Sequence, residues 1–177
     1  MSGKRNLALI GFMGSGKTTI GRLASRRLDL QFLDTDVLLE ERYGMSVREM
    51  FSANGETEFR RLEKLLIDDL CSRTGLLIAT GGGVVLNQEN VSNLRKNSLV
   101  LLLQAEPHTL ISRIGSVDSR PLLATASNPV ERLSQLLLER GEAYRQAAHC
   151  KINSDLLDAD ETVERVVTLY NTIAGEI

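Results

Sequence analysis

The chain has 177 residues, a length typical of a single domain, and we expect one domain over 1–177. With 42% hydrophobic and 25% charged residues, its composition is that of an ordinary globular protein. The formal net charge of −2 argues against the broad basic surface that binds nucleic acid, so no nucleic-acid partner is expected.

Short apolar runs alternate with longer amphipathic stretches along the whole chain. In chain order, this pattern predicts a strand at 7–10, a helix at 17–28, a strand at 31–33, helices from Ser46 and over 56–71, a strand at 76–80, a helix at 88–96, a strand at 99–103, helices from Pro107 and over 129–148, a strand at 151–153 and a helix at 160–173.

Several of the predicted helices begin with a recognisable capping signal. Ser46 is followed three residues later by Glu49, which is the pattern of a capping box. Asn87 and Asn128 can cap the helices that follow them. Pro107 fits the first turn of a helix, where its missing N–H costs nothing.

Strands that alternate with helices favour a parallel sheet covered by helices on both faces, so the predicted fold class is α/β. In such sheets, ligands bind beyond the carboxyl ends of the strands. Gly11, Asp34 and Gly81 each follow a predicted strand directly. The sequence therefore predicts that these three positions meet at one edge of the sheet.

No apolar run is long enough to cross a membrane. The run at 7–10 ends at Gly11, whereas a spanning helix needs about 20 apolar residues. It is also too short for the core of a signal peptide. Cys71 and Cys150 do not suggest a disulfide framework and are expected to be free thiols. We therefore expect a cytoplasmic protein with no membrane partner.

Residues 11–18 match the phosphate-binding pattern G-x-x-x-x-G-K-[ST] between a predicted strand and helix. Its glycines let backbone N–H groups face phosphate oxygens, and the helix directs its positive dipole end at the same anion. Lys17 can reach the terminal phosphates, and Thr18 can place its hydroxyl on Mg²⁺. An ordinary glycine-rich turn is the alternative. The predicted nucleotide-binding residues here are Gly14, Ser15, Gly16, Lys17, Thr18 and Thr19.

Asp34 and Asp36 stand at the end of the second predicted strand. Two carboxylates at i and i+2 of an extended segment lie on the same side. One can hold Mg²⁺, usually through water, because this ion keeps several of its waters. The other can face an acceptor hydroxyl. The alternative is a polar turn in which Asp36 caps the next helix.

Three further patterns have both a functional and a structural interpretation. Arg60 and Glu63 are helix neighbours, and sequence physics alone favours a solvated charged face. Three consecutive glycines at 81–83 cost backbone entropy, which suggests a close approach, although a flexible loop is the alternative. The turn-rich stretch at about 115–128 separates two helices and is a plausible mobile lid.

Together these residues resemble the shikimate kinase family from about Asn6 to the last helix. The chain matches the family's phosphate loop at 11–18, its D-x-D element at 34–36 and its E-x-x-F-R segment at 56–60. Further along, it matches the triple glycine at 81–83, the lid Arg-Pro at 120–121 and the R-x-x-x-Y element at 140–144. Many NTPases share the phosphate loop, whereas the combination is specific.

The resemblance implies transfer of the γ-phosphoryl group of ATP to the 3-hydroxyl of shikimate. Lys17 and the lid residue Arg120 would neutralise charge, and Asp36 would hold the acceptor hydroxyl as the candidate base. Arg60 and Arg140 would bind the shikimate carboxylate, which suits the planar guanidinium group.

The resemblance also implies that Thr18 and, through water, Asp34 hold Mg²⁺. The shikimate-binding region would be about 34–63, and Gly81, Gly82 and Gly83 would offer further backbone groups to shikimate. Arg113 would lie beside adenine, and Arg120 would contact ATP as well. The implied fold is a three-layer α/β/α sandwich with strand order 2-3-1-4-5, and the expected state is a monomer.

Three alternatives remain open at this point. A related small-molecule kinase, such as one for gluconate, would share most of these features. A GTPase switch would need an N-K-x-D motif, which the sequence lacks. A non-enzymatic nucleotide-binding module would not need Asp36. The segment at 153–157 lacks the arginine and proline that some family members carry there, so an adenine contact from this segment is expected to be through backbone or absent.

Overall fold

A computed structural model describes residues 4–114 and 128–173 of the chain. Its five-stranded sheet consists of β1 (Asn6–Ile10), β2 (Gln31–Asp34), β3 (Leu76–Ala79), β4 (Ser98–Gln104) and β5 (Cys150–Asn153). The strand order is β2-β3-β1-β4-β5, and every neighbouring pair is parallel. The predicted α/β class and strand order are therefore confirmed, with strand ends that differ from the prediction by one residue at most.

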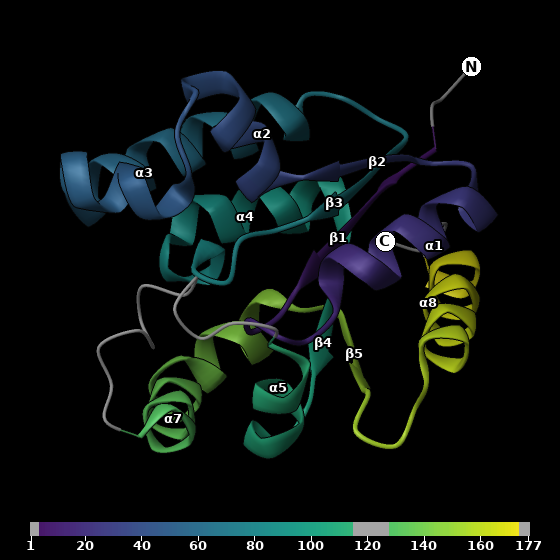
Figure 1. Ribbon diagram of the computed structural model, residues 1–177. Helices are drawn as coiled ribbons and strands as arrows, with labels where there is room; N and C mark the ends of the chain where they lie inside the picture. The colour runs from purple at the N-terminus through teal and green to yellow at the C-terminus, as the bar shows by residue number, and fades with distance from the viewer. Residues whose placement is uncertain (1–3, 115–127, 174–177) are drawn as a thin grey trace.

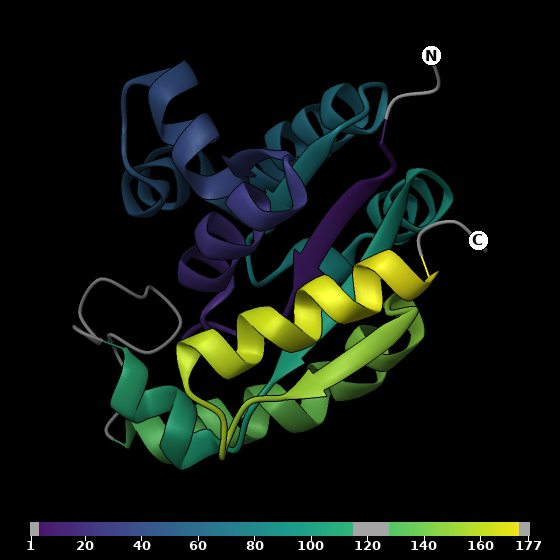
Figure 2. The ribbon, with the colours of Figure 1, turned by 90° about the vertical axis from the view of Figure 1, so that its right-hand side faces the viewer.

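Helices cover both faces of this sheet (Figures 1 and 2). They are α1 (Lys17–Leu28), α2 (Thr35–Tyr43), α3 (Val47–Cys71), α4 (Gln88–Asn97), α5 (Pro107–Arg113), α7 (Pro129–Ala147) and α8 (Ala159–Ile173), with a short 3-10 helix η1 (Val84–Leu86). Side chains alternate along β1: Leu7 and Leu9 pack with the α1 and α8 side, while Ala8 and Ile10 pack with the α4 and α7 side. The result is a three-layer sandwich with a core on each side of the sheet.

The predicted capping signals are confirmed at three helix starts. Ser46 and Glu49 form both bonds of a capping box at the start of α3. The Asn87 side chain accepts from the backbone of the first turn of α4, and Asn128 does the same for α7. These bonds satisfy N–H groups that a helix start otherwise leaves without partners.

Two details differ from the sequence prediction. The cap of α2 is Asp34, whose Oδ1 accepts from the N–H of Asp36 at 3.0 Å, so the interpretation of Asp36 as the cap is wrong. Asp36 lies instead in the first helical turn. The two helices predicted from Ser46 and over 56–71 join as α3, with a kink at Gly55 (φ 77°, ψ 169°) that only glycine adopts readily.

The predicted lid lies outside the described residues, except for Asn128 at its end, and so does Arg120. Cys71 and Cys150 are free thiols, as predicted. Within 4–114 and 128–173, no helix combines the length and the apolar character that crossing a membrane requires.

Gly21 allows α1 to pack closely on the sheet. A β-carbon there would lie 2.7 Å from Phe32 Cε2 and 3.0 Å from Leu77 Cδ2. We expect Gly21→Ala to lower the free energy of unfolding, because overpacking costs about 1–3 kcal/mol and outweighs the gain in helix propensity of about 1 kcal/mol.

Gly141→Ala on α7 is the matched control for this prediction. Its β-carbon would meet only the flexible end of Arg145, at 3.3 Å. We expect this variant to be up to about 1 kcal/mol more stable than the parent. Urea unfolding of both variants checks the pair, and equal shifts in the same direction would contradict the packing argument.

Candidate active site

The phosphate loop joins β1 to α1 at the carboxyl edge of the sheet. Gly14 (φ 78°) and Gly16 (φ 89°) adopt left-handed backbone conformations that let the chain turn into the helix. The Lys17 ammonium donates to the carbonyl oxygens of Gly11 at 2.8 Å and of Phe12 at 2.9 Å. The loop therefore holds the Lys17 ammonium at the N-terminal end of α1, where an anion would bind.

A cavity of about 520 Å³ opens in front of this loop. All six predicted nucleotide-binding residues of the loop line it, from Gly14 to Thr19. Asp34 and Asp36 line the same cavity from the end of β2 and the start of α2. Its size falls within the range of about 300–1,000 Å³ of small-molecule sites, and the structure thus brings the loop and both aspartates together.

Thr18 and Asp34 line this cavity side by side. The Thr18 hydroxyl donates to Oδ2 of Asp34 at 2.7 Å, while Oδ1 of the same carboxylate is bound by the start of α2. The carboxylate is fixed on both sides. A hydroxyl and a carboxylate so close together are the hard oxygen donors that Mg²⁺ prefers.

A second cavity of about 100 Å³ lies beside the first. Met13, Asp36 and Gly82 line both cavities, so these residues mark where the two meet. A nucleotide in the larger cavity and a small molecule in the smaller one would therefore approach each other at Asp36. Asp36 lies in the first turn of α2 and lines this junction; it does not cap the helix.

The smaller cavity carries two guanidinium groups. Arg60 reaches it from α3 and Arg140 from α7, where Arg140 lies 5.9 Å from the centre of the Phe12 ring. Arg60 Nη1 donates to Glu63 at 2.9 Å, and the Glu63 side chain is only 1% exposed. The prediction of a solvated charged face is therefore wrong, because this pair is turned toward the sheet edge.

Glu63 is a buried carboxylate that pairs with Arg60 and lies near Asp36. Burial raises the pKa of its carboxyl, Arg60 opposes that rise, and the nearby charge of Asp36 adds to it. Arg60 also contacts Glu56 at 3.2 Å. The planar guanidinium groups of Arg60 and Arg140 offer paired donors that could bind the carboxylate of a ligand.

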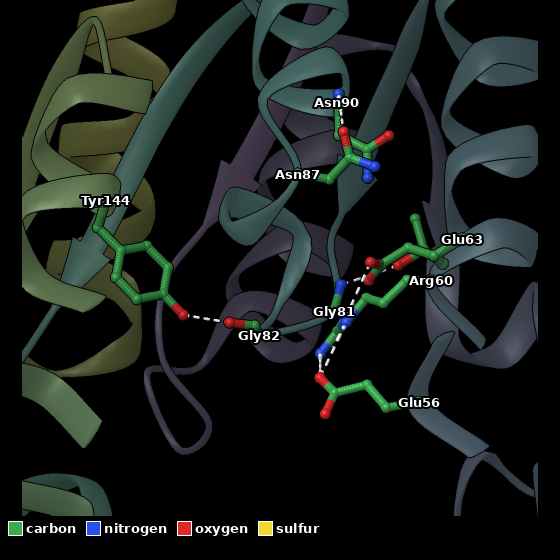
Figure 3. A network of polar contacts seen from close by, with 9 residues as sticks. Glu56, Arg60, Glu63, Gly81, Gly82, Asn87, Asn90 and Tyr144 are labelled. Atoms are coloured by element: carbon green, nitrogen blue, oxygen red, sulfur yellow. Dashed lines mark hydrogen bonds and ion pairs between the residues drawn. The ribbon is translucent and has the colours of Figure 1, made fainter. Parts of the chain in front are cut away.

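The three glycines at 81–83 lie against the charged side chains of the smaller cavity. Figure 3 shows Gly81 beside Arg60. A β-carbon on Gly81 would lie 2.6 Å from Oδ1 of Asp36, and one on Gly83 would overlap the Arg60 guanidinium. The close approach expected from the triple glycine is confirmed. Any larger residue at these two positions would displace a charged group of the site.

Arg113, the last residue of α5, lines the larger cavity. Its guanidinium donates to the hydroxyl of Ser154 at 2.8 Å and to the carbonyl of Ser154 at 2.7 Å. Ser154 and Leu157 line the same cavity. The segment without arginine and proline therefore contributes side chains to the cavity wall, and it fixes Arg113 in place.

Sequence reasoning missed the apolar wall of the smaller cavity. Val47, Phe51 and Phe59 line it, and the two aromatic rings pack with their centres 4.6 Å apart. No residue-level signal separates a phenylalanine that faces the core from one that faces a ligand.

Comparisons with known proteins agree with this arrangement. The sequence model of the family described as "Shikimate kinase" matches residues 13–171. The chain is 42% identical over 171 residues to a shikimate kinase of Caldanaerobacter subterraneus subsp. tengcongensis, covering 97% of this chain and 99% of that protein. The chain belongs to the shikimate kinase family. The resemblance read from the motifs is thereby confirmed.

Solved structures of shikimate kinases share the fold. The shikimate kinase of Acinetobacter baumannii in complex with shikimate superposes with a TM-score of 0.90 at 32% identity, covering 98% of this chain and 96% of that one. A gluconokinase of Sinorhizobium meliloti gives a TM-score of 0.60 at 14% identity. That second likeness shows a common fold only, so it does not favour gluconate as the acceptor.

Proposed function

We propose that this shikimate kinase family member transfers the γ-phosphoryl group of ATP to the 3-hydroxyl of shikimate, giving shikimate 3-phosphate and ADP. The observation that carries this proposal is the meeting of two cavities at Asp36. One cavity contains the phosphate loop and the other contains two arginines. Phosphoryl transfer depends mainly on such positioning and on charge neutralisation.

On the nucleotide side, the loop from Gly14 to Thr19 would hold the phosphates through its backbone N–H groups. Lys17 would follow the γ-phosphoryl group and neutralise part of its charge. Arg113, fixed by Ser154, would flank the base. The predicted role of Arg120 in the same neutralisation lies outside the described residues.

Mg²⁺ is the metal that fits the oxygen ligands of this site. Thr18 and Asp34 would hold it, Asp34 through water, because the Thr18 hydroxyl lies 2.7 Å from Oδ2 of Asp34 and the start of α2 fixes Oδ1 of the same carboxylate. When bound, the ion would neutralise charge on the phosphates. The monomeric state and the cytoplasmic location expected from the sequence belong to the same proposal.

On the acceptor side, Arg60 and Arg140 would bind the carboxylate of shikimate, and Asp36 would accept a hydrogen bond from its 3-hydroxyl. The apolar wall of Phe51 and Phe59 would cover the ring. Excluding water from this smaller cavity, the proposed acceptor cavity, would keep water from competing for the phosphoryl group.

A coupled assay of ADP release tests the proposal. The purified chain is given Mg²⁺ and ATP with shikimate, with gluconate, or with no acceptor. We expect rapid ADP release only with shikimate. Equal or faster release with gluconate would overturn the acceptor assignment, and equal release in all three arms would mean that the chain is an ATPase.

Gly83 offers a specific test of the acceptor side. Because a β-carbon at this position overlaps the Arg60 guanidinium, Gly83→Ala should displace Arg60 and leave the fold intact. We expect the KM for shikimate to rise about tenfold to a hundredfold, which corresponds to the loss of one charged hydrogen bond of about 1.5–3 kcal/mol. The KM for ATP should change little.

Gly82→Ala serves as the comparison for Gly83→Ala. Its β-carbon would meet nothing closer than 3.7 Å, so Arg60 stays in place and the rise in the KM for shikimate should be smaller. Steady-state kinetics with either substrate varied measure both variants. A larger effect at Gly82 than at Gly83 would contradict the steric argument.

A further inference from the structure

Tyr144 links three separate segments around the acceptor cavity. It projects from α7 and is 3% exposed. Its hydroxyl donates to the carbonyl oxygen of Gly82, on the side of the glycine loop opposite Arg60 (Figure 3). Its ring packs edge-on against Phe12 of the phosphate loop, with ring centres 6.1 Å apart.

The Tyr144 hydroxyl can donate to the Gly82 carbonyl oxygen whatever the pH of the assay. Burial raises the pKa of the hydroxyl, so it remains protonated and able to donate at any pH at which the enzyme works. On the other side of the loop, the N–H of Gly81 donates to the Thr35 hydroxyl at 2.8 Å. The Tyr144 and Thr35 hydroxyls therefore hold the glycine loop from two sides, in addition to the backbone bonds that Val84 and Leu86 donate to the carbonyls of Gly81 and Gly83.

Fixing the Gly82 carbonyl also fixes the next N–H along the chain. The peptide group is planar and trans, so the N–H of Gly83 points away from the carbonyl of Gly82. Within the described residues, no protein atom accepts a hydrogen bond from this N–H, and Gly83 lines the acceptor cavity. The direction of a backbone donor beside the cavity thus depends on the Tyr144 hydroxyl.

Tyr144 also stands one helical turn from Arg140. Both residues pack near the Phe12 ring, Tyr144 in a T-shaped arrangement and Arg140 with its guanidinium 5.9 Å from the ring centre. A hydrogen bond from α7 to the glycine loop therefore ties the helix that carries Arg140 to the peptide that carries the Gly83 donor.

We propose that Tyr144 is a positioning residue for the acceptor: through Gly82 it orients the Gly82–Gly83 peptide, and it holds the helix of Arg140 against that peptide. This inference rests on the proposed function. Tyr144 does not line the larger cavity, so its hydroxyl acts on shikimate binding and leaves nucleotide binding alone.

The variant Tyr144→Phe removes the hydroxyl and keeps the ring against Phe12. Tyr170→Phe is a matched control, because Tyr170 is also buried and its hydroxyl also donates to a backbone carbonyl, that of Arg5. Tyr170 belongs to the α8 side of the sheet, in the other core. Both variants lose the same kind of bond, at different places.

For Tyr144→Phe we expect the KM for shikimate to rise about fivefold to tenfold, the range given by the loss of one buried hydrogen bond. The KM for ATP should change less than about twofold. Tyr170→Phe should change neither constant. The proposal is overturned if Tyr144→Phe leaves the KM for shikimate unchanged, if both constants rise together, or if Tyr170→Phe has the same kinetic effect.

A second measurement does not depend on activity. In protein labelled with ¹⁵N-glycine and free of ligands, the amide signal of Gly83 should move in Tyr144→Phe and stay in place in Tyr170→Phe. An unmoved Gly83 signal in Tyr144→Phe would overturn the positioning role even if the parent enzyme phosphorylates shikimate. Failure of the parent enzyme to use shikimate, with a moved signal, would instead count against the proposed function.

Discussion

Replacing Lys17 with alanine is expected to lower kcat by at least about 10²–10³-fold, the loss typical of removing one group that stabilises transition-state charge. The Lys17 ammonium lies within the phosphate loop, bound to the carbonyls of Gly11 and Phe12. Its removal takes one positive charge from the site where the γ-phosphoryl group is proposed to be transferred. Steady-state ADP release at saturating substrates measures the effect.

Lys4→Ala is the control for this prediction. Lys4 also donates from its ammonium to a backbone carbonyl, that of Leu28 at 2.9 Å, but it lies before β1 and does not line either cavity of the site. We expect Lys4→Ala to retain normal kcat, and both variants to keep their circular dichroism. Normal turnover in Lys17→Ala would contradict the assignment of the phosphate loop.

The two aspartates are expected to differ in their response to Mg²⁺. In Asp34→Asn the oxygen pair with Thr18 loses its charge, so more Mg²⁺ should be needed and excess Mg²⁺ should recover part of the rate. Asparagine can still cap α2, so the fold should survive. A Mg²⁺ titration at saturating ATP and varied shikimate measures this recovery.

Asp36→Asn leaves that oxygen pair intact, so extra Mg²⁺ should have little effect. What is lost is a charged hydrogen bond to the acceptor hydroxyl, worth about 1.5–3 kcal/mol, together with any general-base catalysis, typically about 10²–10⁴-fold. The KM for shikimate and kcat should both suffer. If Mg²⁺ rescues Asp36→Asn and not Asp34→Asn, the two roles are reversed; if it rescues both or neither, the carboxylates act as one unit.

The sequence predicted the elements of the fold well because its signals are local. The apolar runs of β1 and β4, the capping box at Ser46 and the asparagine caps each depend on a few neighbouring residues. The phosphate loop is also local, because one continuous segment supplies its backbone donors. These features need no knowledge of what packs against them.

The arrangement of the acceptor cavity could not be predicted in the same way. Arg60 and Glu63 have the spacing of a surface ion pair, and only the packing of α3 against the glycine loop buries them. Tyr144 and Gly82 are 62 residues apart in the chain and meet only in the folded protein. The sequence around Asp36 was ambiguous because an aspartate at either position 34 or 36 could cap the next helix. In the structure β2 ends at Asp34 and α2 begins at Thr35, so Asp34 is the cap.

The most direct test of the central claim is to identify the product. The purified chain is incubated with ATP, Mg²⁺ and shikimate, and the phosphorylated product is isolated and examined by phosphorus NMR. The account predicts a single phosphate ester whose phosphorus couples to the ring proton on carbon 3 of shikimate, formed in equal amount to ADP. Inorganic phosphate as the main product, or an ester at another hydroxyl, would contradict it.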